Sequence, residues 1–163
     1  MKLHYLLVCL FATLSATVVC AADDYAATAS PAKKTEAAAD ALTSARALIQ
    51  QERWRDAITE LKGLNLTANA DWNNLMGYSH RKAKTPDYAA AQQYYGAALR
   101  IDPKHRGALE YSGELFLINK DLPAAQARLS TLDNVCGKNC AEYLQLKTAI
   151  ASYEAGTYPV AAR

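Results

Sequence analysis

The chain has 163 residues, enough for one domain with a core of modest size. Its 18 basic and 16 acidic residues are interspersed and give a formal net charge of +2. A near-neutral chain of this kind offers no electrostatic attraction to nucleic acid or to an acidic membrane surface, so we expect neither as a partner.

Residues 1–22 have the pattern of a cleaved signal peptide. Lys2 supplies a positive charge near the start, an apolar run extends from Leu6 to Val19, and small residues follow at the predicted cleavage point. The apolar run is too short for a good membrane span, so we expect export, cleavage and no stable membrane insertion afterwards. Lipidation of Cys20 and retention of the segment as an anchor are alternatives that the sequence favours less.

Residues 23–36, DDYAATASPAKKTE, lack large aliphatic side chains and contain a proline. We expect a flexible leader, because such a segment has too little apolar surface to bury against a core. Cleavage before the leader would remove Cys9 and Cys20 and leave Cys136 and Cys140 as the cysteines of the mature chain.

From Ala37 onward, apolar residues recur at intervals of three and four, which is typical of amphipathic helices, and proline occurs only at breaks. Segments that begin at Arg53, Asp87 and Asp121 align with one another. Each carries an alanine, and these alanines are spaced 34 residues apart: Ala57, Ala91 and Ala125. A large residue follows each alanine by four positions: Leu61, Tyr95 and Leu129. The pattern predicts an all-helical chain built from repeated helix pairs.

A glycine lies near the middle of the helix that precedes the second segment and of the helix that precedes the third, at Gly77 and Gly113. A glycine in one helix and an alanine in the next let two helices approach closely, while aromatic residues fill the space beside the contact. Pro103 follows the second segment and marks the end of its helix, because proline cannot continue a helix.

This pattern resembles the tetratricopeptide repeat (TPR) family, over about residues 37–137. The second repeat carries the most specific match, and the third is clear: Gly77, Ala91, Tyr95 and Pro103 in the second, Gly113 and Ala125 in the third. The run from Asn74 to Tyr143 is similar to exported proteobacterial TPR proteins with a Cys-x3-Cys pair after the last repeat. The resemblance therefore implies a bacterial protein that is periplasmic or secreted.

The resemblance also implies the fold class: an all-α, right-handed superhelical stack of about three antiparallel helix pairs (a TPR solenoid) with a C-terminal capping helix. The expected boundaries are repeats at residues 37–69, 70–105 and 106–137, a capping helix at 138–155 and a tail at 156–163. A stack of this kind needs its last apolar face covered, which is the expected role of the capping helix.

We expect Cys136 and Cys140 to form a disulfide that fixes the angle of the capping helix. Export places them in an oxidising compartment, where disulfides persist. Residues four apart on a regular helix hold their Cβ atoms roughly 5–6 Å apart, whereas a disulfide needs about 3.5–4.5 Å. Gly137 and Asn139 supply the turn that the bond requires. A redox-labile pair and a metal contact are the alternatives, although two thiols fall short of the four ligands usual for structural zinc.

By resemblance to the TPR family, the first helix of each pair lines a concave groove that binds an extended peptide or a segment of a partner protein. The exposed positions of those helices are predicted to be Arg46, Asn74, Tyr78, Arg81, Glu110 and Glu114. An asparagine and an arginine can read a peptide backbone or carboxylate, a tyrosine can stack, and two glutamates favour a basic segment. The same positions are also compatible with a plain solvated polar face.

No catalytic triad, phosphate loop or paired carboxylate stands out in the sequence, and we expect no enzymatic activity and no cofactor. Trp54 and Trp72 are expected to cover the core, His80 to be a packed histidine and His105 to be a solvated linker residue. The expected function is a non-enzymatic protein–protein interaction module in the cell envelope. A thiol-dependent redox or metal-handling protein is the alternative, and the oligomeric state is not predicted.

Overall fold

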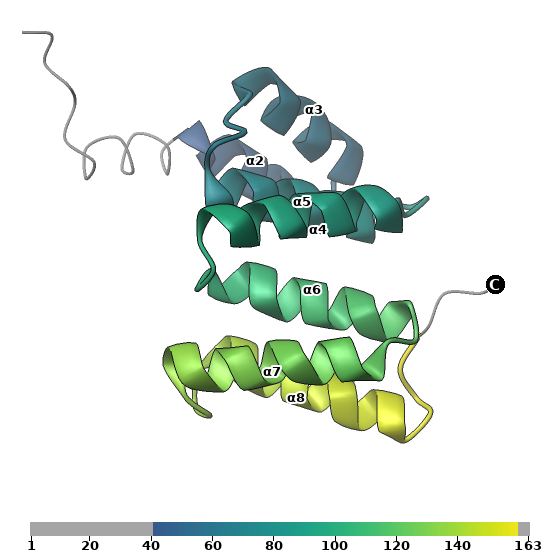
Figure 1. Ribbon diagram of the computed structural model, residues 1–163. Coiled ribbons are helices and arrows are strands. Elements are labelled where there is room, and N and C mark those ends of the chain that lie inside the picture. The colour runs from purple at the N-terminus through teal and green to yellow at the C-terminus, as the bar shows by residue number, and fades with distance from the viewer. Residues whose placement is uncertain (1–40, 160–163) are drawn as a thin grey trace, which may run out of the picture.

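The computed structural model describes residues 41–159, so the predicted signal peptide and the predicted leader lie outside the described residues. Within this range the chain is all-helical and has no strand, which confirms the all-α prediction (Figure 1). The helices are α2 (Thr43–Gln50), α3 (Trp54–Leu64), α4 (Ala70–Lys82), α5 (Tyr88–Ile101), α6 (Arg106–Ile118), α7 (Leu122–Cys136) and α8 (Ala141–Glu154). None of these helices is long and apolar enough to cross a membrane.

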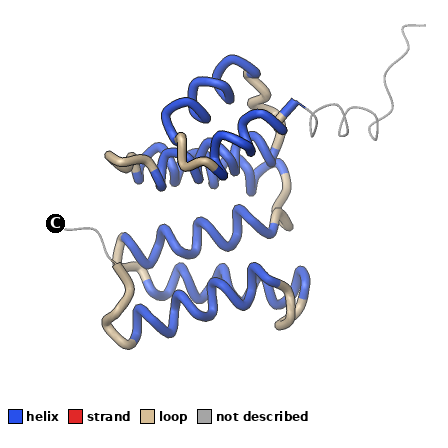
Figure 2. The backbone as a smooth tube through the Cα atoms, turned by 180° about the vertical axis from the view of Figure 1, so that it is seen from behind, coloured by secondary structure: helices blue, strands red, loops and turns tan. Residues whose placement is uncertain are grey.

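Each helix packs against the next one along the chain, through short connecting loops. The helices are stacked in chain order, from α2 and α3 at one end to α7 and α8 at the other, as the two opposite views show (Figures 1 and 2). Alternate helices also touch, because α4 contacts both α2 and α6, and α6 contacts α8. The helices α2, α4, α6 and α8 therefore form one continuous row, which we call the even-helix row.

Several helices begin at a side chain that accepts a hydrogen bond from the first turn. The Oδ1 atoms of Asn69, Asp87 and Asp121 each accept from a backbone N–H three residues on, at 2.8, 2.9 and 3.1 Å. Such caps satisfy donors that a helix leaves unpaired at its N-terminus, and each contributes about 1 kcal/mol. Helix α5 ends at Ile101, just before the proline at position 103, as predicted.

The predicted small residues lie where helices come close together. The alanines of the 34-residue spacing, Ala57, Ala91 and Ala125, are all completely buried. A Cβ atom on Gly77 of α4 would lie 2.7 Å from the ring of Tyr95 in α5. The absence of a side chain at position 77 therefore leaves the space that this ring occupies. Gly113 differs, because its neighbour is Leu146 of α8 rather than a residue of α7; a Cβ there would stand 2.6 Å from that side chain.

The buried apolar residues form two main clusters, one at each end of the stack. The first surrounds Leu42, Leu61 and Met76, and it includes Trp72, whose indole N–H donates to the Leu61 carbonyl at 2.7 Å. The second lies between α6, α7 and α8. A small cluster of Ala91, Tyr95 and Leu115 lies between them. Trp72 thus covers the core as expected, while Trp54 is half-buried at its edge.

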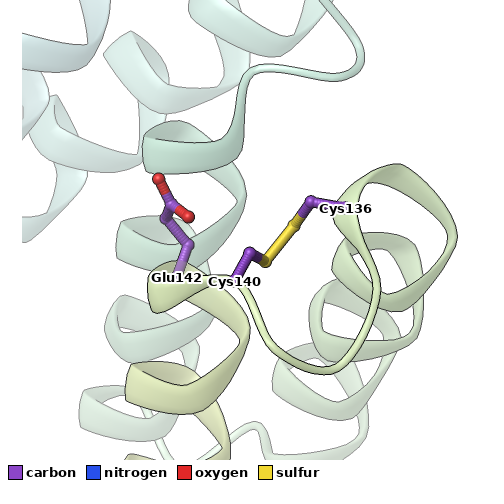
Figure 3. A group of neighbouring side chains, drawn as sticks. All are labelled: Cys136, Cys140 and Glu142. Carbon is purple, nitrogen blue, oxygen red and sulfur yellow. A yellow bond between two sulfur atoms is a disulfide. The ribbon is translucent and has the colours of Figure 1, made fainter.

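Helix α8 occupies the place of the predicted cap, in contact with both α6 and α7. The sulfur atoms of Cys136 and Cys140 lie 2.08 Å apart, at disulfide distance, and link the end of α7 to the start of α8 (Figure 3). Gly137 has a φ of +75°, a conformation that side chains other than glycine's rarely adopt, so the link leaves the helical path as expected.

Candidate functional site

The structure brings together four of the six predicted groove residues where α4 meets α6. Tyr78 and Arg81 stand three residues apart on α4, and Glu110 and Glu114 stand four apart on α6, so each pair shares one helix face. The Arg81 guanidinium donates to the Glu114 carboxylate at 2.5 Å and joins the two helices. We call these four residues, together with Tyr111, the α4–α6 cluster.

The aromatic rings of the cluster surround the Arg81 guanidinium. Its central carbon lies 5.5 Å from the ring centre of Tyr78 and 5.4 Å from that of Tyr111, within the range of cation–π attraction. The ring centres of Tyr78 and Tyr111 are 4.6 Å apart. The ring of Trp54 meets that of Tyr78 edge-on, with 5.8 Å between their centres. The guanidinium is thus held in one place by a carboxylate and two rings.

The prediction that all six groove residues are exposed is wrong for three of them. Asn74, Arg81 and Glu110 are buried, because α4, α6 and α8 pack closely enough for their neighbours to cover them. Tyr78 and Glu114 are half-buried, and Arg46 is exposed. Whether these residues contact a partner stays a prediction, but only the half-buried and exposed ones offer surface to it directly.

The surroundings of Glu110 disfavour the ionised form of its carboxyl group. The residue is 4% exposed, and burial, together with the negative charges of Glu114 and Glu142, raises its pKa to about 8, against the attraction of Arg81. The side-chain amide of Gln145 on α8 reaches it. Turned to present its nitrogen, this amide donates to both carboxylate oxygens, at 2.6 and 3.2 Å. At neutral pH this carboxyl is largely protonated and can itself donate a hydrogen bond.

Two further polar atoms, the hydroxyl of Tyr95 and the Nε of Arg81, lie buried at the base of the cluster. Neither makes a hydrogen bond of good geometry to another described residue, although the phenol and the guanidinium lie close enough to interact electrostatically. Burial raises the pKa of Tyr95 well above its ordinary value and that of Tyr111 to about 12. Both phenols therefore keep their protons at physiological pH and can donate hydrogen bonds.

Arg46 belongs to a second polar network, which links three helices of the even-helix row. Its guanidinium lies 3.3 Å from one oxygen of Asp71 on α4, and the other oxygen of Asp71 lies 3.0 Å from Nε2 of His105 at the start of α6. The hydrogen bond from His105 and the charge of Arg46 lower the pKa of Asp71. Arg46 is therefore not part of the α4–α6 cluster.

The expectation that His105 is a solvated linker residue is wrong. Its side chain is 13% exposed and caps α6, with Nδ1 accepting the N–H of Ala108 at 3.0 Å. Since Nδ1 accepts, Nε2 carries the proton and donates to Asp71. Asn74 packs nearby, with its amide 3.0 Å from the position that a Cβ on Gly107 would take.

His80 is a packed histidine, as expected. Its ring stacks on Tyr94 at a centroid distance of 5.5 Å, and burial lowers its pKa below the ordinary value. Because His80 lies on α4 and Tyr94 on α5, this stacking helps to hold the two helices together, so the role of His80 is structural.

The chain that follows α8 turns back along the stack, past the end of α7 and to the level of α6 (Figures 1 and 2). Its half-buried Tyr158 packs against the C-terminal core and, with Gln145 of α8 and Glu114 of α6, lines a shallow cavity of about 430 Å³ that is wide open to solvent. Burial and the charge of Glu114 raise the pKa of Tyr158 to about 12, and the Arg81 guanidinium opposes the rise. The phenol of Tyr158 therefore interacts electrostatically with both Arg81 and Glu114.

The disulfide region holds one group that the sequence did not single out. The carboxylate of Glu142, in the first turn of α8, has an oxygen within 4.8 Å of both cysteine sulfurs (Figure 3). The same carboxylate lies 3.4 Å from Arg106 of α6. With both sulfurs in a disulfide, only the carboxylate could act as a ligand, so metal binding here requires reduction first.

Three residues around the cluster were not predicted from the sequence: Tyr111, Gln145 and Tyr158. Residues 34 positions after Glu110, Tyr111 and Glu114 are Leu144, Gln145 and Thr148, and all three line the cavity between α6 and α8. Extending the 34-residue spacing into the capping helix would thus have located Gln145. Tyr158 follows the last helix and has no periodic signal.

The chain has no match among protein-family models, among curated proteins or among solved structures. The TPR resemblance and the function that it implies therefore stay predictions, and a proposal for function depends on the geometry of the described residues.

Proposed function

We propose that this protein is a non-enzymatic interaction module of the TPR type, which binds an extended segment of a partner protein along the even-helix row. The observation that carries the proposal is the α4–α6 cluster. Charged groups and tyrosines gather on one face, where two alternate helices meet, and hold the Arg81 guanidinium between Glu114 and two rings.

The helix order supports a TPR arrangement. Helices α2 and α3, α4 and α5, and α6 and α7 fall in pairs within the ranges 37–69, 70–105 and 106–137, and α8 falls within 138–155. The first helix of each pair contacts the first helix of the next pair. We propose that these pairs form a right-handed superhelical stack with the even-helix row on its concave side and α8 as the cap.

The charges of the cluster suggest the chemistry of the partner segment. Glu114 is paired with Arg81, and Glu110 is largely protonated near neutral pH, so the two glutamates present little net negative charge. A strongly basic segment is therefore less favoured than the sequence suggested. The cluster fits a segment that offers an aromatic side chain to the rings and hydrogen-bonding groups to the ion pair.

We place the module in the periplasm or outside a bacterial cell, because of the N-terminal sequence pattern and the disulfide-bonded cysteine pair. A disulfide is a stable feature in an oxidising compartment, which agrees with export. The measurement that tests the location is the mass of the protein recovered from the periplasmic fraction, which should correspond to cleavage near residue 22.

The experiment that tests the binding function is cross-linked capture from the cell envelope with the tagged mature protein. Tyr78→Ala removes the half-buried ring of the cluster, while Tyr78→Phe keeps the ring and is the matched control. We expect a partner that is captured by the wild type and by Tyr78→Phe and is lost with Tyr78→Ala.

Because Tyr78 also packs against Trp54, each variant needs a thermal melt, and capture should be compared only at temperatures where all three are folded. A set of captured proteins that is the same for all three variants would contradict binding at the cluster. Capture that needs the ring would support it and identify the partner by mass spectrometry.

A second candidate function is thiol-dependent metal handling or redox chemistry at Cys136 and Cys140, which Glu142 favours by offering a third ligand atom close to both sulfurs. After mild reduction, the protein should bind one equivalent of Co²⁺ with thiolate charge-transfer absorption, and Glu142→Gln should weaken that binding. A disulfide that survives mild reductant would remove this candidate.

A further inference from the structure

The segment after α8 is fastened back onto the helix. The backbone N–H groups of Thr157 and Tyr158 both donate to the Ser152 carbonyl, at 2.9 and 3.1 Å, and the Thr157 hydroxyl donates to the same oxygen at 3.0 Å. Gly156 makes the reversal possible with a φ of +73°, which is the usual way for a glycine to end a helix. The segment Gly156–Pro159 therefore has a defined path and is not simply a loose end.

The path places one aromatic side chain beside Glu114, at the edge of the α4–α6 cluster. Tyr158 is the large side chain of this segment, and it lines the cavity beside Glu114 and Gln145. Its phenol interacts electrostatically with the Glu114 carboxylate and the Arg81 guanidinium. The chain thus places an aromatic, hydrogen-bonding side chain of its own next to the ion pair.

We propose that the segment Gly156–Pro159 is an internal occupant of the α4–α6 cluster, and that a partner segment binds by inserting its own aromatic residue in place of Tyr158. This inference rests on the proposed function, because it specifies how the same site is regulated and what it selects. The occupant and the partner compete for the ion pair of Arg81 and Glu114, so both cannot be bound there at once.

Tethering explains how so small a segment can hold the site. A single ring beside the ion pair makes a weak ligand, but the hydrogen bonds to the Ser152 carbonyl hold the segment on α8, and so short a tether provides an effective concentration of about millimolar. The affinity for any outside segment is then reduced by the fraction of molecules in which the site is open. Loss of Tyr158 should therefore raise the affinity for an outside segment.

The test uses the full chain and a peptide probe, AGTYPVAAR, which has the sequence of residues 155–163. The peptide is titrated into ¹⁵N-labelled wild type and into Tyr158→Ala, up to several millimolar. We expect saturable shifts of the amides of Arg81, Glu114 and Gln145 in Tyr158→Ala and at least tenfold weaker binding to wild type. The peptide AGTAPVAAR, which lacks the tyrosine, should bind neither.

A second variant tests whether Tyr158→Ala acts by opening the site or by disturbing the packing around position 158. Gly156→Val strains the reversal at φ +73° and releases the segment while its tyrosine is kept, so it should also bind the peptide in trans. Equal binding to wild type and to both variants, or no saturable shift in either variant, would overturn the proposal.

The outcome can be separated from that of the proposed function. If envelope capture depends on the Tyr78 ring but is not increased by Tyr158→Ala, the module stands and the internal occupant does not. If the peptide binds Tyr158→Ala but no partner depends on Tyr78, the internal occupant is supported, whereas the proposed function at this site and the competition with a partner are contradicted.

Discussion

Gly77 shows how a single missing methyl group can set the distance between two helices. The ring of Tyr95, which is fully buried, occupies the space where a side chain at position 77 would begin. At Gly113 the corresponding space is filled by the end of the Leu146 side chain, which can turn aside more easily than a ring held on all sides.

Gly77→Ala should therefore lower the free energy of unfolding by about 1–3 kcal/mol, because overpacking against Tyr95 outweighs the helix propensity that alanine adds. Gly113→Ala should cost less, since Leu146 can change rotamer. Gly63→Ala on α3 is the control: a Cβ there meets nothing within 4 Å, so alanine should stabilise by about 0.5–1 kcal/mol. Urea denaturation measures all three, and equal effects at positions 63 and 77 would contradict the packing argument.

Glu110 makes stability depend on pH. Its pKa is about 8 in the folded protein, against an ordinary value of 4.5 that applies to the unfolded chain. Between these two values the folded state holds a proton that the unfolded state has lost. The contribution of this group to stability is therefore fully present below pH 4.5 and is lost as pH rises from there to about 8.

Glu110→Gln should remove this dependence, with little change at pH 5 and a gain on the order of 1–2 kcal/mol at pH 9. Urea denaturation at the two pH values measures the difference, and Glu154→Gln at the exposed end of α8 serves as the control. The same loss of stability between pH 5 and pH 9 in Glu110→Gln as in wild type would assign the dependence to another group.

At the scale of the elements, α8 is held to the stack in two ways. Its apolar face packs on α6 and α7 through Tyr143, Leu146 and Ile150. Its start is tied to the end of α7 by the disulfide. The packing positions the helix, and the covalent link restricts the unfolded chain over a loop that is only a few residues long.

Because the loop is so short, the double variant Cys136→Ser with Cys140→Ser should lose only about 2 kcal/mol and should still fold with α8 in place. The far-UV circular dichroism should be unchanged, and the urea midpoint should fall. A loss of helical signal equal to the whole of α8 would show that the disulfide, and not the apolar face, holds the cap.

At the scale of the whole molecule, the all-helical architecture could be predicted because its signals are local. The three-and-four spacing of apolar residues, the capping Asp87 and Asp121 and the terminating Pro103 each act within one or two turns. The buried alanines could be predicted for the same reason, since a repeat places equivalent residues in equivalent contacts.

The site could be predicted only in part, because it depends on contacts between residues far apart in sequence. Arg81 and Glu114 were both predicted as exposed groove residues, whereas their ion pair and the burial of Arg81 depend on contacts between helices far apart in sequence. His105 was misjudged because its partner, Asp71, lies 34 residues earlier. Tyr158 lies beside Glu114 because the chain reverses direction at Gly156. Such a reversal has no periodic pattern in the sequence from which it could be predicted.

The two larger apolar clusters are separated by the small cluster of Ala91, Tyr95 and Leu115, against which Tyr111 of the α4–α6 cluster packs, and the ion pair of Arg81 and Glu114 joins α4 to α6 there. Two cores joined by a narrow seam are two potential cooperative units, each able to open at its own denaturant concentration. A segment bound across the ion pair stabilises both units at once, so it merges their transitions into one steeper curve. Occupancy of the site would then be visible as a change in the slope of unfolding as well as in its midpoint.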